Sequence, residues 1–134
     1  DSNICRNYKL LTSIKGVGPI TAIVMLCSTL NFTKITDHRK FACYCGLAPF
    51  EHNSGTSVRG GCHTSSMANR DIKVQLNRSA LIAIRCDPQL KAYYERKVAE
   101  GKHKFSVLNA VRAKIAARCF AVVRRGTPYV ALQI

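Results

Sequence analysis

Acidic residues are scarce in this chain, and that scarcity limits the chemistry it can perform alone. Asp and Glu total 7 against 21 Lys and Arg, and no acidic pair is closely spaced in the sequence. A two-metal nuclease needs clustered carboxylates to hold its ions close together. The composition therefore argues against a self-contained nuclease of that kind, and we expect no metal ligands in this chain.

Long apolar runs and paired metal ligands are lacking as well. No apolar run of about 18 residues occurs, and the start has no basic segment followed by an apolar one, so we expect neither a membrane span nor a signal peptide. The seven cysteines are scattered, and Cys62-His63 has no partner cluster at zinc-ligand spacing. We therefore expect reduced cysteines, a cytoplasmic location and no membrane partner. Because the chain begins at Asp1 rather than Met, we expect a fragment of a longer protein.

The basic excess is the strongest feature of the composition. A formal net charge of +14 on 134 residues favours a polyanionic partner and salt-sensitive binding, and nucleic acid is the first candidate. The length suits one domain, residues 1–134, with a modest core. We take DNA as the expected partner.

A glycine-rich turn at residues 14–22 is the most informative local pattern. Gly16 and Gly18, one apolar residue apart, permit positive φ angles and close backbone approach, while Pro19 suits the first turn of a following helix. The amides of that turn, beside Lys15, form an anion site for a phosphate oxygen. The third glycine of a dinucleotide-binding fingerprint is absent.

This pattern resembles the helix-hairpin-helix DNA-binding motif, in which the turn holds the sugar-phosphate backbone without reading bases. A plain helix–helix turn is the alternative. The residues that we assign to DNA binding here are Lys15, Gly16, Val17, Gly18 and Thr21.

Apolar residues recur at three- and four-residue steps along most of the chain, which predicts an all-α fold of five or six helices without a central sheet. We place the hairpin at about residues 3–30, with its second helix ending near Leu30, then a short helix capped by Asp37. A helical remainder spans residues 67–125, with Asp87 and Pro88 starting one of its helices. Residues 127–134 are predicted to form a tail or a short strand.

A loop at about residues 47–66 interrupts this periodicity and is rich in Gly, Ser and Thr. Loops of this length in a compact domain are often functional. Ser54 precedes Gly55, where a phosphate could approach, and is the first candidate nucleophile; Ser57 is the second. His52 and Glu51 lie upstream as candidate bases, and Arg59 would offset phosphoryl charge. Ordinary turn chemistry is the alternative for these serines.

Several motifs together resemble the carboxy-terminal domain of insertion-sequence transposases of the IS110 family. The resemblance covers about residues 10–125, and its combination and order are more specific than any single motif. The matching segments, in order, are residues 11–19 (LTSIKGVGP), 41–49 (FACYCGLAP), 54–55 (SG), 69–71 (NRD), 93–94 (YY) and 101–102 (GK).

The resemblance implies a DNA recombinase in which a serine of this domain attacks a DNA phosphodiester during transposition. Ser54 best matches that serine, and Arg70 and Lys73, at the start of a basic helix, are assigned to DNA binding. The family also has an amino-terminal RuvC-like domain with an acidic DEDD set, to which any Mg²⁺ would belong; guide RNA and a homo-oligomer would select and align the sites. Without that domain we expect this chain to be inactive. A non-catalytic helix-hairpin-helix module or an inactive transposase remnant is the alternative.

Overall fold

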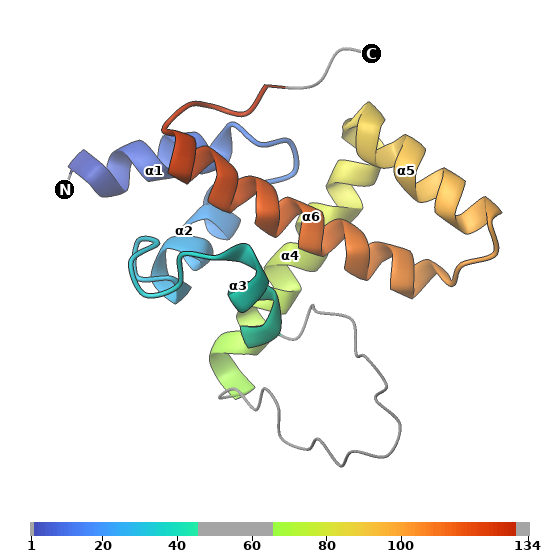
Figure 1. The fold of residues 1–134 in the computed structure, drawn as a ribbon, viewed down its shortest axis with the longest axis horizontal. Helices are drawn as coiled ribbons and strands as arrows, with labels where there is room; N and C mark the ends of the chain where they lie inside the picture. Colours follow the sequence, from blue (N-terminus) through green and yellow to red (C-terminus); the bar gives the residue numbers. More distant parts are fainter. Residues whose placement is uncertain (1, 46–65, 131–134) are drawn as a thin grey trace.

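The computed structural model describes residues 2–45 and 66–130, and within them the chain forms six α-helices and no strand (Figure 1). The prediction of an all-helical fold with five or six helices is therefore confirmed for this part of the chain. In order, the helices are α1 (Ser2–Thr12), α2 (Pro19–Ser28), α3 (His38–Tyr44), α4 (Ser66–Cys86), α5 (Pro88–Ala99) and α6 (Lys104–Arg125).

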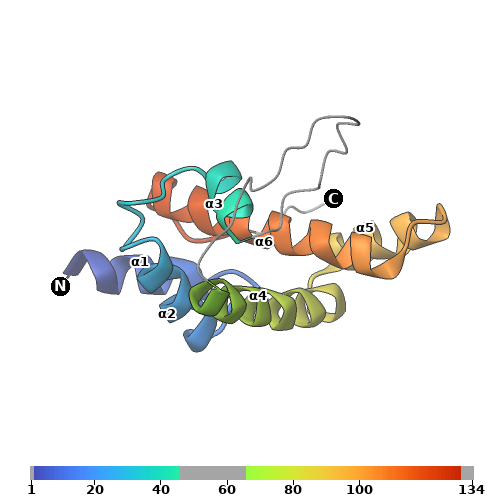
Figure 2. The same cartoon turned by 90° about the horizontal axis from the view of Figure 1, so that it is seen from below.

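Helices α4 and α6 cross at the centre of the molecule and organise the core. Helix α4 packs against α2, α5 and α6, and α6 also contacts α1, α3 and α5, so that α3 and α6 lie over α2 and α4 (Figure 2). The ring of Phe120 meets Phe32 edge-on, with ring centroids 4.9 Å apart, and Phe41 at 5.4 Å. The buried face of α6 includes Val107, Val111, Ile115, Cys119 and Val122, with Leu108 and Val123 partly buried beside it.

Two predicted aspartate caps are present and start the helices that they precede. The carboxylate of Asp37 accepts a hydrogen bond from the Arg39 amide at the start of α3. Asp87 accepts from the amide of Gln89 at the start of α5, with Pro88 in the first turn. Such caps satisfy backbone donors that have no partner inside the helix.

The segment after α2 departs from the expected helix end near Leu30. Helix α2 ends at Ser28, and Leu30, Asn31 and Phe32 have φ angles of 49°, 57° and 62°. Three consecutive left-handed residues are unusual outside glycine, and periodicity does not reveal them. Here Asn31 accepts a hydrogen bond from the side-chain amide of Asn7 at 2.8 Å, which ties this segment to α1.

The end of the described chain lies across α1. Helix α6 stops at Gly126, whose φ of 73° is the left-handed conformation common at helix ends. Beyond it, residues 127–130 carry no regular structure, and the amide of Tyr129 donates to the Ser13 hydroxyl at 2.8 Å. In the described residues this segment is therefore a tail rather than a strand. None of the helices described is long and apolar enough to cross a membrane.

Candidate nucleic-acid interface

The turn between α1 and α2 is anchored by two apolar side chains and exposes the lysine between them. Ile14 and Val17 are buried in the core, and the amide of Val17 donates to the carbonyl of Ile14 at 3.0 Å. Lys15 is exposed. Because Val17 points inward, any ligand at this turn would meet the backbone of Val17 rather than its side chain.

Gly16 is required by the packing of the turn against α4. Its φ is 94°, as the sequence predicted for a glycine of this turn, and a Cβ atom placed there would lie 2.7 Å from the carbonyl oxygen of Ser79. Real Cβ atoms do not approach a backbone oxygen so closely. The fold alone therefore explains why this residue is a glycine.

Gly18 differs, because it does not adopt the positive φ that a glycine permits. Its φ is −93° and its ψ −175°, an extended conformation open to any residue, and a Cβ atom added there would meet nothing within 4 Å. The extended backbone suits the residue that precedes a helix, because it lets the chain turn into α2. Neither backbone strain nor crowding explains a glycine at this position.

The first turn of α2 presents unused backbone donors beside Gly18. Pro19 has no amide hydrogen, and no side chain caps the helix. The first amide of α2 with a backbone partner is that of Ala22, which donates to the carbonyl of Gly18. The amides of a first helical turn have no partner inside the helix. With the helix dipole and the absence of acidic residues in this turn, the site favours an anion.

Thr21 contributes to this site through its backbone alone. Its side chain is 5% exposed, and its hydroxyl lies 3.2 Å from the Ser79 hydroxyl on α4. That hydrogen bond joins α2 to α4 directly beneath the turn. The sequence could not reveal that the Thr21 hydroxyl faces inward, and a DNA contact at Thr21 stays a prediction.

Arg70 and Lys73 are exposed on α4 but lie away from the turn. Gly16 meets α4 at Ser79 and Ala83. At 1.5 Å per residue, the two basic residues are about 9–20 Å back along the helix axis from those contacts. The structure therefore does not bring Arg70 and Lys73 together with Lys15.

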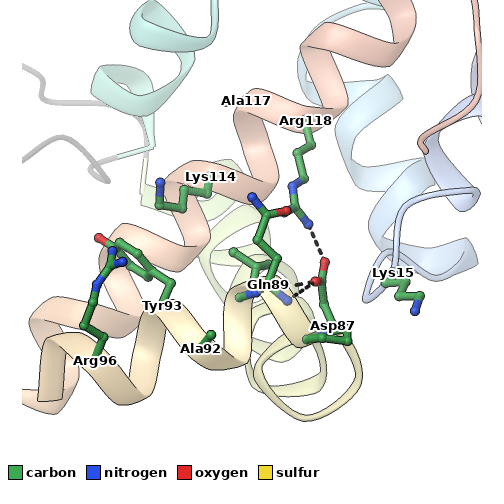
Figure 3. Close-up of a pocket in the computed structure, with 11 residues that line it drawn as sticks. Lys15, Asp87, Gln89, Ala92, Tyr93, Arg96, Lys114, Ala117 and Arg118 are labelled. Carbon is green, nitrogen blue, oxygen red and sulfur yellow. Dashed lines mark hydrogen bonds and ion pairs between the residues drawn. The ribbon is translucent and has the colours of Figure 1, made fainter. Parts of the chain in front are cut away.

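Lys15 instead forms one end of a groove of about 870 Å³ between α5 and α6 (Figure 3). The groove has three further basic side chains, and no sequence motif marks them as one site. Spacings of three and four residues on two helices are the signal that could have found them, but only the packing of α5 on α6 joins the two helices. They are Arg96 on α5 and Lys114 and Arg118 on α6.

Asp87 is the one carboxylate that lines the groove, and its negative charge is already paired with Arg118. Its carboxylate accepts from Arg118 at 2.7 Å and from the amides of Gln89 and Leu90. Burial alone would raise the pKa of Asp87, but the hydrogen bond and charge of Arg118, with the two amides, outweigh burial and lower it. Asp87 therefore stays ionised and holds Arg118 in place.

The described residues offer no metal site. They contain no group of three or more His, Cys, Asp or Glu side chains placed to hold an ion. The donor set that Mg²⁺ requires, several oxygen ligands around one point, is thus not met in this part of the chain.

The sequence of this chain matches the family model described as "Transposase IS116/IS110/IS902 family" over residues 8–95. The chain belongs to this transposase family. The match includes the α1–α2 turn, all of α4 and the first eight of the 12 residues of α5, so the groove lies partly inside and partly beyond the matched residues.

Curated relatives support the same transposase family. The chain is 38% identical over 121 residues to "Insertion element IS110 uncharacterized 43.6 kDa protein" of Streptomyces coelicolor, covering 90% of this chain and 29% of that protein. It is 26% identical over 126 residues to "Pilin gene-inverting protein" of Moraxella lacunata, covering 92% and 39%. It is 30% identical over 112 residues to "Insertion element IS900 uncharacterized 42 kDa protein" of Mycobacterium paratuberculosis, covering 82% and 28%. The chain thus spans well under half the length of these curated relatives.

The residues predicted to carry the transposase chemistry lie outside the described part of the chain. They are Glu51, His52, Ser54, Ser57 and Arg59. Among the described residues, Arg112 on α6 has a charge that interacts with Cys45 at the end of α3. Burial lowers the pKa of Arg112, and its Nε atom is buried without a hydrogen-bond partner among the described residues.

Proposed function

We propose that this chain is the DNA-binding and strand-transfer part of a transposase. The observation that carries the proposal is the open first turn of α2, where Gly18 has room for a side chain that the sequence does not place there. A phosphate seated on those amides would occupy that space. The exposed Lys15 beside it adds a charge of the required sign.

DNA is the polyanion that the comparisons favour. The printed names of the relatives refer to insertion elements and to inversion of a pilin gene, and both describe rearranged DNA. A contact made by backbone amides and one lysine reaches phosphate oxygens and reads no bases. Binding by this turn is therefore expected to depend weakly on sequence and strongly on salt.

Ser54 is the proposed nucleophile for strand transfer. Its hydroxyl oxygen would attack the phosphorus of a DNA phosphodiester, forming a serine–phosphate ester as the bond to one deoxyribose oxygen breaks. The hydroxyl proton would pass to a base, for which His52 and Glu51 are the candidates in this chain, and the leaving deoxyribose oxygen would take up a proton. Attack by a strand's hydroxyl on the ester would then rejoin DNA and release Ser54.

The rest of the transposase has roles that this chain cannot supply. An acidic amino-terminal domain, guide RNA and a homo-oligomer are the partners that we expect in the full-length protein from its family resemblance.

Arg59 would offset charge on the transferring phosphoryl group, and Ser57 is the second candidate nucleophile.

Covalent adducts test the serine chemistry directly. In the full-length transposase with its RNA and DNA, Ser54→Ala should abolish protein–DNA adducts seen after denaturing electrophoresis, because no hydroxyl remains to form the ester. DNA binding should be unchanged within about twofold. Ser57→Ala is the matched control and should keep the adducts. Adducts that survive in Ser54→Ala but vanish in Ser57→Ala would transfer the role to Ser57, and adducts in both would end the proposal for this loop.

A further inference from the structure

The groove between α5 and α6 has an excess of positive charge that the described residues do not neutralise. Four basic side chains line it and only one carboxylate, that of Asp87. Among the described residues the two ion pairs are Arg118–Asp87, at 2.7 Å, and Lys97–Glu100, at 3.4 Å. Lys15, Arg96 and Lys114 therefore enter no ion pair with the described part of the chain.

Tyr93 concentrates this charge at one end of the groove. Lys114 Nζ lies 4.6 Å from the centroid of the Tyr93 ring, and the guanidinium carbon of Arg96 lies at 5.7 Å. Lys97 Nζ approaches the same ring at 5.9 Å. Each such contact is attractive, yet three cations around one ring also repel one another. An anion placed between Lys114 and Arg96 would relieve that repulsion.

The arrangement of the charges indicates an extended anion rather than a compact one. Lys114 and Arg96 both lie at the Tyr93 end, and Lys15 lies at the opposite end, beyond Asp87 (Figure 3). The groove is therefore lined by three separate parts of the fold, α5, α6 and the α1–α2 turn. A nucleic-acid strand carries charges at regular intervals along its length and would meet both ends at once.

Base recognition is not what the groove is built for. Tyr93 is the one aromatic side chain among its lining residues, and its ring already carries Lys114. Strand-binding sites that read or stack bases present free aromatic faces. The chemistry on offer is contact with phosphates.

We propose that the groove holds a phosphodiester backbone that continues from the α1–α2 turn, with Arg96 and Lys114 contacting its phosphates and Tyr93 positioning Lys114. This inference rests on the proposed function, because Lys15 belongs both to the turn and to the groove. Arg118 keeps a structural role here, joined to Asp87. DNA and RNA strands share the phosphodiester chemistry, so the experiment includes both.

The test compares two double variants of the full-length transposase. Arg96→Gln/Lys114→Gln removes one charge each from α5 and α6 inside the groove. Lys91→Gln/Lys104→Gln removes one charge each from the same helices at exposed positions outside it. Affinity for a DNA duplex of random sequence and for an RNA strand of equal length is measured across a range of NaCl concentrations, with thermal unfolding recorded for each variant.

The groove variant should bind about tenfold more weakly at 0.1 M NaCl, and its plot of log K against log salt should become shallower by about two, since each phosphate contact contributes about 0.9. The control should stay within about twofold of the parent protein. If the groove variant loses affinity for only one of the two nucleic acids, that nucleic acid is the one the groove binds. Arg96→Lys/Lys114→Arg, which keeps both charges, should restore the slope.

Equal slopes for the groove variant and the control would overturn the inference. If Gly18→Val weakens binding in the same assay while the groove variant matches its control, the inference fails and the proposed function stands. If the parent protein binds neither nucleic acid, both fail. If the double variant unfolds at a lower temperature than the control, the single variant Lys114→Gln replaces it in the binding assay. Its plot of log K against log salt should become shallower by about one, and an unchanged slope would overturn the inference.

Discussion

Gly16 and Gly18 look alike in the sequence but have different roles in the structure. Gly16 combines a positive φ with a close approach to Ser79, so its side chain is excluded by the fold. Gly18 has an ordinary extended backbone and open space around it. Only the second glycine is therefore informative about a ligand, and substitutions at the two positions should have separable effects.

Replacing Gly16 with alanine should destabilise the fold. The added Cβ would be strained by the φ of 94° and would press on the Ser79 carbonyl. Gly101→Ala is the matched control, because Gly101 has a φ of 95° but nothing within 4 Å of its added Cβ. We expect Gly101→Ala to lower the free energy of unfolding by about 1–2 kcal/mol, from left-handed strain alone.

Gly16→Ala should lower the free energy of unfolding by about 1–3 kcal/mol more than Gly101→Ala, because overpacking against α4 is added to the strain. Urea unfolding of the 134-residue chain, followed by circular dichroism, measures both. Equal losses in the two variants would show that the contact with Ser79 relaxes freely and that φ alone keeps Gly16 a glycine.

At the scale of the helices, Asp87 joins α5 to α6 by two kinds of contact. It caps α5 through the amides of Gln89 and Leu90, and it pairs with Arg118 on α6. Arg118 also donates to the Gln89 side chain at 3.2 Å and lies over the ring of Tyr129 at 4.8 Å. The Asp87 carboxylate thereby holds the start of α5 against α6 beside the groove. Its negative charge should therefore contribute to the free energy of unfolding.

Asp87 should make the stability of the chain depend on pH in the acidic range. Its pKa in the folded protein lies below the ordinary value of 3.8, so the charged form favours folding. This contribution is fully present above the unfolded pKa and is lost as the pH falls through the folded pKa. Asp87→Asn, which can still cap a helix, should therefore destabilise the chain more at pH 6 than at pH 2–3.

Asp37→Asn is the matched control for this pH effect, because Asp37 caps α3 but enters no ion pair with the described residues. Unfolding free energies at the two pH values should differ little between Asp37→Asn and the parent protein. A pH profile for Asp87→Asn parallel to that of the parent would contradict a stabilising charge on Asp87.

The helices were largely predictable from local signals, whereas their meeting points were not. Apolar steps of three and four residues predicted the helices, and Asp37, Asp87 and Pro88 predicted two of their starts, because caps act within a few residues. The left-handed residues 30–32 escaped prediction because a tertiary partner, Asn7, holds Asn31 in place. Likewise, nothing in the sequence places Lys15 and Lys114 on one groove, since only the packing of α5 and α6 near the turn does so.

At the scale of the whole molecule, charge and family point the same way. The chain has a net charge of +14 and belongs to a transposase family, and four of the described cations line a groove that reaches the α1–α2 turn. The predicted DNA contacts at the turn lie on described residues. Arg70 and Lys73 lie far along α4 from that turn, and whether they contact the same DNA stays a prediction.

The central claim is that the first turn of α2 holds a phosphate, and Gly18→Val tests it most directly. The new side chain fits the fold, because the backbone is extended and the space is open, but it would fill the place of the phosphate. Cys27→Val, which puts the same side chain at an exposed position near the other end of α2, is the matched control. The measurement is the affinity of the full-length protein for a DNA duplex across a range of NaCl concentrations.

We predict that Gly18→Val lowers DNA affinity by about tenfold and makes the dependence of log K on log salt shallower by about one, while Cys27→Val behaves as the parent protein. Both variants should keep the helical circular dichroism of the parent. A folded Gly18→Val protein that binds DNA with the affinity and the salt dependence of the parent would contradict the claim and leave the α1–α2 turn a structural connection.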